Sequence, residues 1–233
     1  MIKLGLVGKD IAHSRSQAMY EKILGQDVDY HLLDYAIEHS IPKLDDLFSQ
    51  GFLGLSVTYP YKQLFLDDVV IVEADIKQLG AINCIRRIGE VFEATNTDYL
   101  AADWLLKNEY SRYKNFLILG SGNMSRVFES LLSKSSQSYQ MVSRKRNGEL
   151  NSLDYTSLLS SNESSLVINC CSREFVFKAS LPEGTGFWDM NYSFPAHNHL
   201  KNESIKYYEG LDLLEWQAKF ALKFWEIVLP RNS

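Results

Sequence analysis

The chain has 233 residues, of which 45% are hydrophobic and 23% charged, and its net charge is −5. This composition is typical of a folded protein that buries a core, and it differs from that of a disordered chain. The acidic balance excludes the basic surface that binds nucleic acid or an anionic membrane, so we expect neither partner. The apolar stretch at residues 4–7 ends at Lys9 and Asp10. It indicates a strand rather than a signal peptide or a membrane span, and we expect a cytoplasmic protein.

The first hundred residues alternate predicted strands and helices. Ser40 and Pro42 favour the start of one helix and Gly51 its end,. Gly89-Glu90 indicates a hairpin turn. In chain order we expect a strand at 2–7, a helix at 16–24, strands at 28–35 and 52–57 around a helix at 40–50, a helical stretch at 69–79, and short strands at 84–88 and 91–94.

A second alternation follows a connecting helix. Strands that alternate with helices indicate a parallel sheet and therefore an α/β fold. We expect helices at 98–108, 123–134 and 211–228, and strands at 116–119, 139–142, 166–169 and 186–190.

The three cysteines, Cys84, Cys170 and Cys171, are odd in number, and two of them are adjacent. Adjacent cysteines have a poor spacing for an ordinary disulfide or a zinc site, so we expect buried thiols in a reducing compartment. His197 and His199 lie in a polar segment without an evident third ligand. We therefore expect no metal site.

A glycine pattern separates the strand at 116–119 from the following helix. Gly120 permits a tight turn, Gly122 lets the backbone approach a pyrophosphate, and the helix N-terminus offers amides to the phosphates,. Ser125 stands in place of the third glycine. The alternative is a strand-to-helix turn that needs glycine only for its backbone conformation.

Cations follow the next strand, in the sequence Ser143-Arg144-Lys145-Arg146. An NAD site carries an acidic residue here for the ribose hydroxyls, whereas cations suit a 2′-phosphate, which Arg binds through two parallel hydrogen bonds. The alternative is a solvated run of charges. Together with the glycine turn, this segment favours NADP as the cofactor.

Short motifs occur in a fixed order along nearly the whole chain. They are His13-Ser14-Arg15-Ser16, Val57-Thr58-Tyr59-Pro60-Tyr61-Lys62, Gly80-Ala81-Ile82-Asn83, Asn96-Thr97-Asp98, Gly120 to Arg126, Arg144, Asp189-Met190-Asn191-Tyr192 and Gly210-Leu211-x-Leu213-Leu214-x-x-Gln217-Ala218. This series resembles the shikimate dehydrogenase family, with its patterns H-S-x-S-P, N-V-T-x-P-x-K, G-A-x-N-T, N-T-D-G, G-A-G-G-A-x-R, N-R-T, D-x-x-Y and G-x-x-M-L-x-x-Q-A.

The resemblance implies NADP-dependent interconversion of 3-dehydroshikimate and shikimate. It implies an α/β substrate-binding domain over residues 1–98, completed by a C-terminal helix at 210–233. A Rossmann-type NADP-binding domain with a parallel sheet would cover 99–209, and the active site would be the cleft between the domains. The partners would be small molecules, and the protein a monomer or a homodimer.

The resemblance also implies roles for individual residues. Lys62 would relay the proton and Asp98 would pair with it. The substrate would be bound by Ser14, Ser16, Thr58, Asn83 and Gln217. The cofactor would be bound by Gly120, Ser121, Gly122, Asn123, Met124, Arg126, Ser143, Arg144, Lys145 and Gly210. Helix capping is the alternative for Ser14, Ser16 and Asp98.

Several positions depart from the family pattern. Ser56 stands where the family has Asn, and Gln17 where it has Pro. The segment 169–173 lacks the usual small residues and carries a bulky Arg173, and the chain is short in its cofactor half. Two alternatives therefore stay open: a paralogue that oxidises quinate or another ring hydroxy-acid, and a catalytically silent nucleotide-binding regulator on the same fold.

Overall fold

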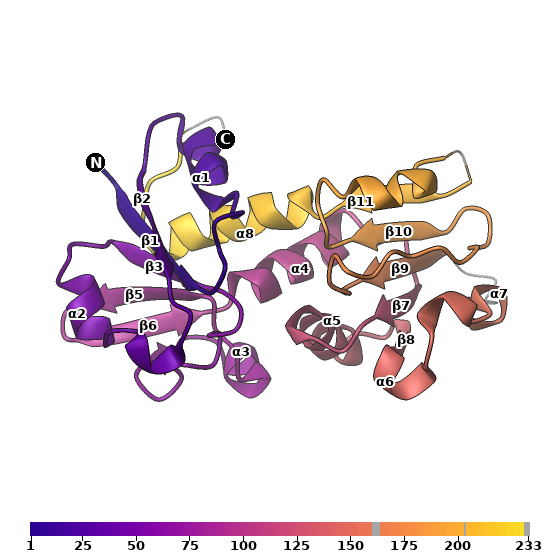
Figure 1. Ribbon diagram of the computed structural model, residues 1–233, viewed down its shortest axis with the longest axis horizontal. Helices are drawn as coiled ribbons and strands as arrows, with labels where there is room; N and C mark the ends of the chain where they lie inside the picture. The colour runs from indigo at the N-terminus through magenta and orange to yellow at the C-terminus, as the bar shows by residue number, and fades with distance from the viewer. Residues whose placement is uncertain (160–163, 203, 231–233) are drawn as a thin grey trace. The chain divides into compact units, whose positions relative to one another are not determined.

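The computed structural model describes residues 1–159, 164–202 and 204–230. Contacts divide the chain into two compact units, the first formed by Met1–Ala101 with Leu214–Ser233 and the second by Ala102–Leu213. Each unit is built around its own sheet (Figure 1). Among the described residues, no helix combines the length and the apolar character that a membrane span requires.

The first unit contains a mixed six-stranded sheet in the order β2-β1-β3-β5-β6-β4. Its strands are β1 (Lys3–Gly8), β2 (Asp29–Asp34), β3 (Gly54–Val57), β4 (Val70–Ile71), β5 (Cys84–Ile88) and β6 (Val91–Thr95). Its helices are α1 (Ser16–Leu24), η1 (Glu38–Ser40), α2 (Leu44–Phe48) and α3 (Ala74–Leu79). β1 pairs in parallel with β2 and β3, whereas β5 is antiparallel to β3 and to β6.

The C-terminal helix α8 (Leu211–Phe224) returns to this first sheet. Trp225, just after the helix, donates from its indole nitrogen to the Ile85 carbonyl at 3.0 Å. A Cβ on Gly54 would lie 2.2 Å from the Trp225 ring, so only glycine leaves room for the indole. The buried cluster formed with α1 includes Leu4, Tyr20 and Cys84.

The second unit contains a fully parallel five-stranded sheet in the order β11-β10-β9-β7-β8. Its strands are β7 (Asn115–Leu119), β8 (Ser138–Val142), β9 (Ser165–Asn169), β10 (Gly186–Asp189) and β11 (Lys206–Glu209). Its helices are α5 (Asn123–Ser133), α6 (Arg144–Asn147), η2 (Leu150–Ser152), α7 (Tyr155–Leu158) and η3 (Pro195–Leu200), and α4 (Thr97–Asn108) leads into the unit. The central strands β7, β9 and β10 are buried at every residue, as expected for a sheet covered on both faces,. This is the predicted α/β architecture with a Rossmann-type sheet.

Aromatic side chains replace long helices over one face of this second sheet. Phe175 and Phe177, in the segment between β9 and β10, join Tyr155 and Phe187 in one buried cluster. The rings of Phe177 and Phe187 lie 5.1 Å apart between centroids. Large aromatic rings bury much area per residue, so a short connection suffices to cover the sheet.

Two expected helices begin later in the structure than predicted, and the C-terminal helix expected at 211–228 ends at Phe224. The helix expected at 40–50 begins only at Leu44, and Ser40 ends η1, where its hydroxyl donates to the Ile37 carbonyl at 2.6 Å. Local side-chain bonding of this kind competes with helix capping. In the stretch 69–79, Val70–Ile71 forms β4 against β6 and only Ala74–Leu79 is helical, because β-branched residues favour strands.

Candidate active site

The centre of the candidate site is an ion pair between Lys62 and Asp98. Lys62 Nζ donates to Asp98 Oδ2 at 2.5 Å, and both side chains are largely buried. Lys62 lies in the loop after β3, where its carbonyl accepts from the Ile82 amide at 2.8 Å. Asp98 is the second residue of α4. Two elements far apart in sequence thus bring one acid and one base into direct contact.

Asn96, rather than Asp98, caps α4. The Asn96 side-chain oxygen accepts from the Tyr99 amide at 3.1 Å, while its amide group donates to the Ala81 carbonyl at 2.9 Å. The Asp98 carboxylate is therefore not needed as a cap, and its Oδ1 makes no hydrogen bond with any described residue. Asn96 is a site residue that the sequence analysis missed, although Asn is among the preferred caps.

Asn83 is tied to the same helix start. Its side-chain oxygen accepts from the amide and the hydroxyl of Thr97, at 2.7 and 3.1 Å. Its Nδ2 has no hydrogen-bond partner among the described residues. The side chain is therefore fixed in place with two donors to spare, which is what a ligand-binding amide requires.

The remaining polar residues predicted for the substrate lie in the same unit. Ser14 Oγ donates to Ser16 Oγ at 3.2 Å and accepts from the Ser16 amide at 3.3 Å, and both serines stand at the start of α1. Thr58 and Gln217 are half-buried, and within the described part of the chain their side chains make no hydrogen bond. The first unit thus contains the whole predicted substrate and catalytic set.

The predicted cofactor residues all lie in the second unit. Gly120 has a φ of 115°, and a Cβ there would lie 3.0 Å from the Ser125 hydroxyl and 3.2 Å from the Cys170 backbone. The turn therefore requires glycine at this position on conformational and steric grounds. A Cβ on Gly122 would meet nothing within 4 Å, and α5 begins after it without a side-chain cap. The open backbone and the free amides suit a phosphate.

The other cofactor candidates are arranged around this turn. Ser143 directly follows β8, which pairs with β7, and the following Arg144 and Lys145 are exposed, with side chains that pair with no described residue. Arg126 donates to Asn123 Oδ1 at 2.5 Å. Ser121 is exposed and Met124 half-buried. Gly210 is distant in sequence, and a Cβ on it would lie 2.8 Å from the Met190 carbonyl oxygen, which explains this glycine by packing alone.

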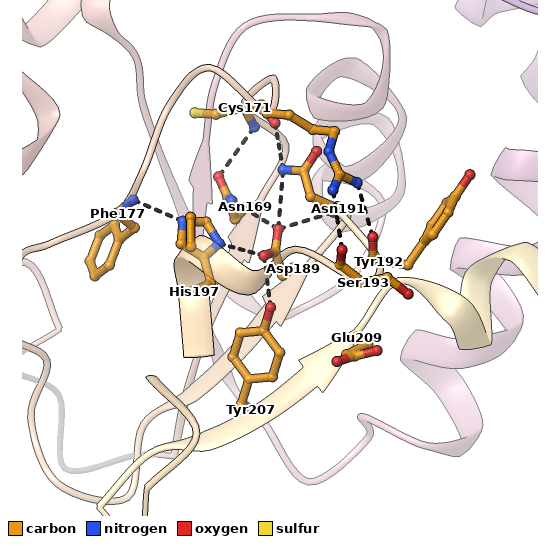
Figure 2. Close-up of polar contacts among 12 residues, drawn as sticks. Asn169, Cys171, Phe177, Asp189, Asn191, Tyr192, Ser193, His197, Tyr207 and Glu209 are labelled. Carbon is orange, nitrogen blue, oxygen red and sulfur yellow. Dashed lines mark hydrogen bonds and ion pairs between the residues drawn. The ribbon is translucent and has the colours of Figure 1, made fainter. Parts of the chain in front are cut away.

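A buried carboxylate organises the carboxyl ends of β9 and β10 (Figure 2). Asp189 Oδ2 accepts from His197 Nδ1 at 2.5 Å and from the Tyr207 hydroxyl at 2.8 Å. Its Oδ1 accepts from Asn169 and from the amide of Asn191, each at 3.0 Å. Burial alone would raise the pKa of Asp189, but these hydrogen bonds outweigh it and hold the pKa below its ordinary value,.

This network also settles the role of His197. Its Nε2 accepts from the Phe177 amide at 2.9 Å, so Nδ1 carries the hydrogen that is donated to Asp189,. Both ring nitrogens are therefore in use, and the ring is fully buried. His199 is exposed and faces the Ala196 carbonyl. Among the described residues, no group of three metal-ligating side chains occurs.

The segment that departs from the family pattern, residues 169–173, is held by hydrogen bonds to the loop after β10. Arg173 donates to the carbonyls of Tyr192 and Ser193 at 3.0 and 3.1 Å and lies over the Phe194 ring. Burial raises the pKa of the Cys171 thiol to about 11. All three cysteines are free, but only Cys84 is buried as expected, whereas Cys170 and Cys171 are half-buried.

Comparisons with known proteins support one family. Residues 6–85 match the family model for the shikimate dehydrogenase substrate binding domain. The chain is 28% identical over 258 residues to a shikimate dehydrogenase (NADP(+)) of Prochlorococcus marinus subsp. pastoris, covering 95% of this chain and 90% of that relative.

Solved structures show the same fold. The shikimate 5-dehydrogenase of Thermus thermophilus, in complex with NADP(H) and shikimate, is 21% identical with a TM-score of 0.74, covering 99% of this chain and 95% of that one. The quinate dehydrogenase of Corynebacterium glutamicum, in complex with NAD, is 20% identical with a TM-score of 0.75, covering 98% and 95%. The fold and the family match define a two-unit α/β protein with a substrate-binding domain and a Rossmann-type unit. Over nearly its whole length the chain is similar to shikimate dehydrogenases, and residues 6–85 match the substrate-binding domain of that family.

Proposed function

We propose that this protein is an NADP-dependent shikimate dehydrogenase, an oxidoreductase that reversibly reduces 3-dehydroshikimate to shikimate on the route to chorismate and the aromatic amino acids. The observation that carries the proposal is the largely buried Lys62–Asp98 pair beside the fixed amide of Asn83. We further propose that the enzyme acts in the cytoplasm as a monomer or a homodimer.

In this proposal residues 1–98, completed by the C-terminal helix at 210–233, bind the substrate, and residues 99–209 form the domain that binds the cofactor. Ser14 and Ser16 bind the carboxylate from the start of α1, where the helix dipole favours an anion,. Thr58, Asn83 and Gln217 bind ring hydroxyls, since their polar atoms are available and the backbone holds them in one unit,.

The second unit fits NADP. The open surface at Gly122 and the uncapped start of α5 suit the pyrophosphate, with Ser121, Asn123, Met124 and Arg126 around it,. Arg144 and Lys145, beside Ser143, carry unpaired charges that suit the 2′-phosphate,. Gly210 belongs to the same proposed set. When bound, NADPH supplies the hydride.

Lys62 and Asp98 carry out the proton transfer to the substrate oxygen. As the ketone carbon gains a hydride, its oxygen becomes an alkoxide that the Lys62 ammonium stabilises and then protonates. Asp98 holds the ammonium through Oδ2, and its free Oδ1 accepts from a ring hydroxyl of the substrate. The low exposure of both side chains strengthens these interactions, because little water screens them,.

One assay tests the proposal. The purified protein is mixed with NADP⁺ and shikimate, quinate or no substrate, and NADPH absorbance is followed. We expect turnover with shikimate. Turnover with quinate alone would favour the alternative of a quinate-oxidising paralogue, to which the similarity to a quinate dehydrogenase structure also points. Nucleotide binding without turnover would favour the catalytically silent regulator. The segment 169–173, which departs from the family pattern and carries Arg173, supports that alternative.

A further inference from the structure

Tyr30 carries a hydroxyl that is buried without a partner. The residue lies on β2, and its ring is partly exposed, but its Oη has no access to solvent and no hydrogen-bond partner in the described structure. The ring lies 5.8 Å from that of Tyr20, in the layer between α1 and the sheet. A buried hydroxyl without a partner is unfavourable by about 1–3 kcal/mol, so such a group calls for an explanation.

Two serines lie near the Tyr30 hydroxyl: Ser16, which belongs to the proposed carboxylate site, and Ser56. Parallel pairing sets Tyr30 opposite Leu4 of β1 and sets Ser56 opposite Leu6, two residues along, on the same face of the sheet. Ser16 and Ser56 lie close enough to lower the pKa of Tyr30, although burial raises it more, so the phenol stays protonated and acts as a donor. Neither serine is in hydrogen-bond geometry with Tyr30.

The existing hydrogen bonds of Ser56 and Ser16 decide which serine oxygen can accept from the Tyr30 hydroxyl. Ser56 Oγ lies 3.4 Å from the Tyr20 hydroxyl and is already engaged there. Among the described residues, Ser16 Oγ accepts only the hydrogen of Ser14, at 3.2 Å. A bound carboxylate would draw both serine hydrogens toward itself, and the Ser14–Ser16 bond would then break. The Ser16 oxygen would be left with an unused acceptor position.

We propose that Tyr30 is a positioning residue of the carboxylate site, which donates its hydroxyl to Ser16 once Ser16 donates to the carboxylate of the substrate. The proposal rests on the proposed function. The chain of hydrogen bonds runs from Tyr30 through Ser16 to the carboxylate, and each bond polarises the next. Tyr30 itself touches no substrate, since its hydroxyl is sealed from solvent.

The test is Tyr30→Phe, which removes only the hydroxyl. We expect KM for shikimate to rise about three- to tenfold, the scale of one neutral hydrogen bond, with kcat and KM for NADP unchanged. The melting temperature should stay the same or rise, because the free protein loses no hydrogen bond. In a Ser16→Ala background, Tyr30→Phe should have no further effect on KM, since Tyr30 acts through Ser16.

Tyr110→Phe is the matched control. Its hydroxyl is also buried without a partner, but it lies in the second unit. It should leave KM for shikimate unchanged. An active wild-type enzyme whose KM is unaltered by Tyr30→Phe, or altered equally with and without Ser16, overturns the inference alone. A wild-type protein that neither turns over nor binds shikimate in calorimetry rejects the proposed function, and this inference with it.

Discussion

Lys62 Nζ and Asp98 Oδ2 lie 2.5 Å apart, and only 12% of the lysine side chain and 13% of the aspartate side chain are exposed. If this ion pair were exposed on the surface, it would contribute little to stability. A largely buried pair next to side chains with spare hydrogen-bond donors instead suits a proton-transfer site, and the first prediction concerns it.

Lys62→Ala should lower kcat for shikimate by about 10²–10⁴-fold, the usual contribution of a positioned acid or base. Lys62→Arg should not restore the rate, because a guanidinium holds its proton too tightly to relay it. Asp98→Asn should also lower kcat. The double mutant should be far less impaired than the product of the two single effects, because the residues act as one unit. Steady-state kinetics on folded proteins, checked by circular dichroism, gives the answer.

Lys77→Ala provides the matched control, since Lys77 is an exposed lysine on α3. It should leave kcat unchanged. A near-normal kcat in Lys62→Ala would contradict the proton-relay role and favour the silent regulator.

Arg144→Ala should raise KM for NADP while changing KM for NAD little. The physical reason is the loss of the guanidinium that would bind the 2′-phosphate, a group that NAD lacks. Arg146→Ala, an exposed cation on the same short helix, should have the smaller effect. Equal losses with both cofactors would show that Arg144 does not bind the 2′-phosphate.

Two glycine substitutions should have opposite effects. Gly122→Ala should leave the melting temperature unchanged or raise it slightly, because its Cβ meets nothing and its φ is −84°,. The same Cβ should weaken NADP binding, measured by calorimetry, because it stands where the pyrophosphate would approach. Gly120→Ala should instead destabilise the fold, because its φ is positive and Cys170 is close. Undiminished NADP affinity in Gly122→Ala would contradict the proposed phosphate site.

Ser14→Ala or Ser16→Ala should weaken substrate binding by about 1–3 kcal/mol, the scale for a lost hydrogen bond to a charged group. The only described side-chain contact to the first amides of α1 is the long one from the Ser16 amide to Ser14 Oγ, at 3.3 Å, so the helix should tolerate either change. Affinity and melting temperature are measured together. If both fall in step, the serines support the helix rather than the carboxylate.

The stability of the second unit should depend on pH through Asp189. Its pKa in the folded protein lies below the ordinary value of 3.8. Its contribution is therefore fully present above that value and is lost as pH falls through the folded pKa. Urea unfolding between about pH 5 and pH 2 should show this loss. Asp189→Asn should be less stable at pH 7 by roughly 2–4 kcal/mol and should flatten the acid side of the curve. Equal acid slopes in both proteins would assign the pH dependence to other groups.

The sequence by itself was sufficient for the features that depend on neighbours along the chain. The apolar run at 116–119 followed by Gly120 predicts a buried strand and a sharp turn, and β7 and the turn with a φ of 115° confirm both. The helix at 16–24, closed by Gly25, is confirmed as α1, and Gly25 has the left-handed conformation. Such features follow from local backbone sterics and hydrophobic periodicity, which a sequence pattern expresses directly.

Only the tertiary structure decided which side chains meet. Motif order indicated Lys62 and Asp98 as partners, but their contact over 36 residues depends on how β3 and α4 lie in the first unit. The pairing of His197 with Asp189 and Phe177, and the unpaired hydroxyl of Tyr30, have no local signature. Ser40 favoured a helix start by its type, yet the chain used its hydroxyl to close a turn. Hydrogen bonds between distant residues depend on packing that brings strands and loops together, and local propensity does not contain that information.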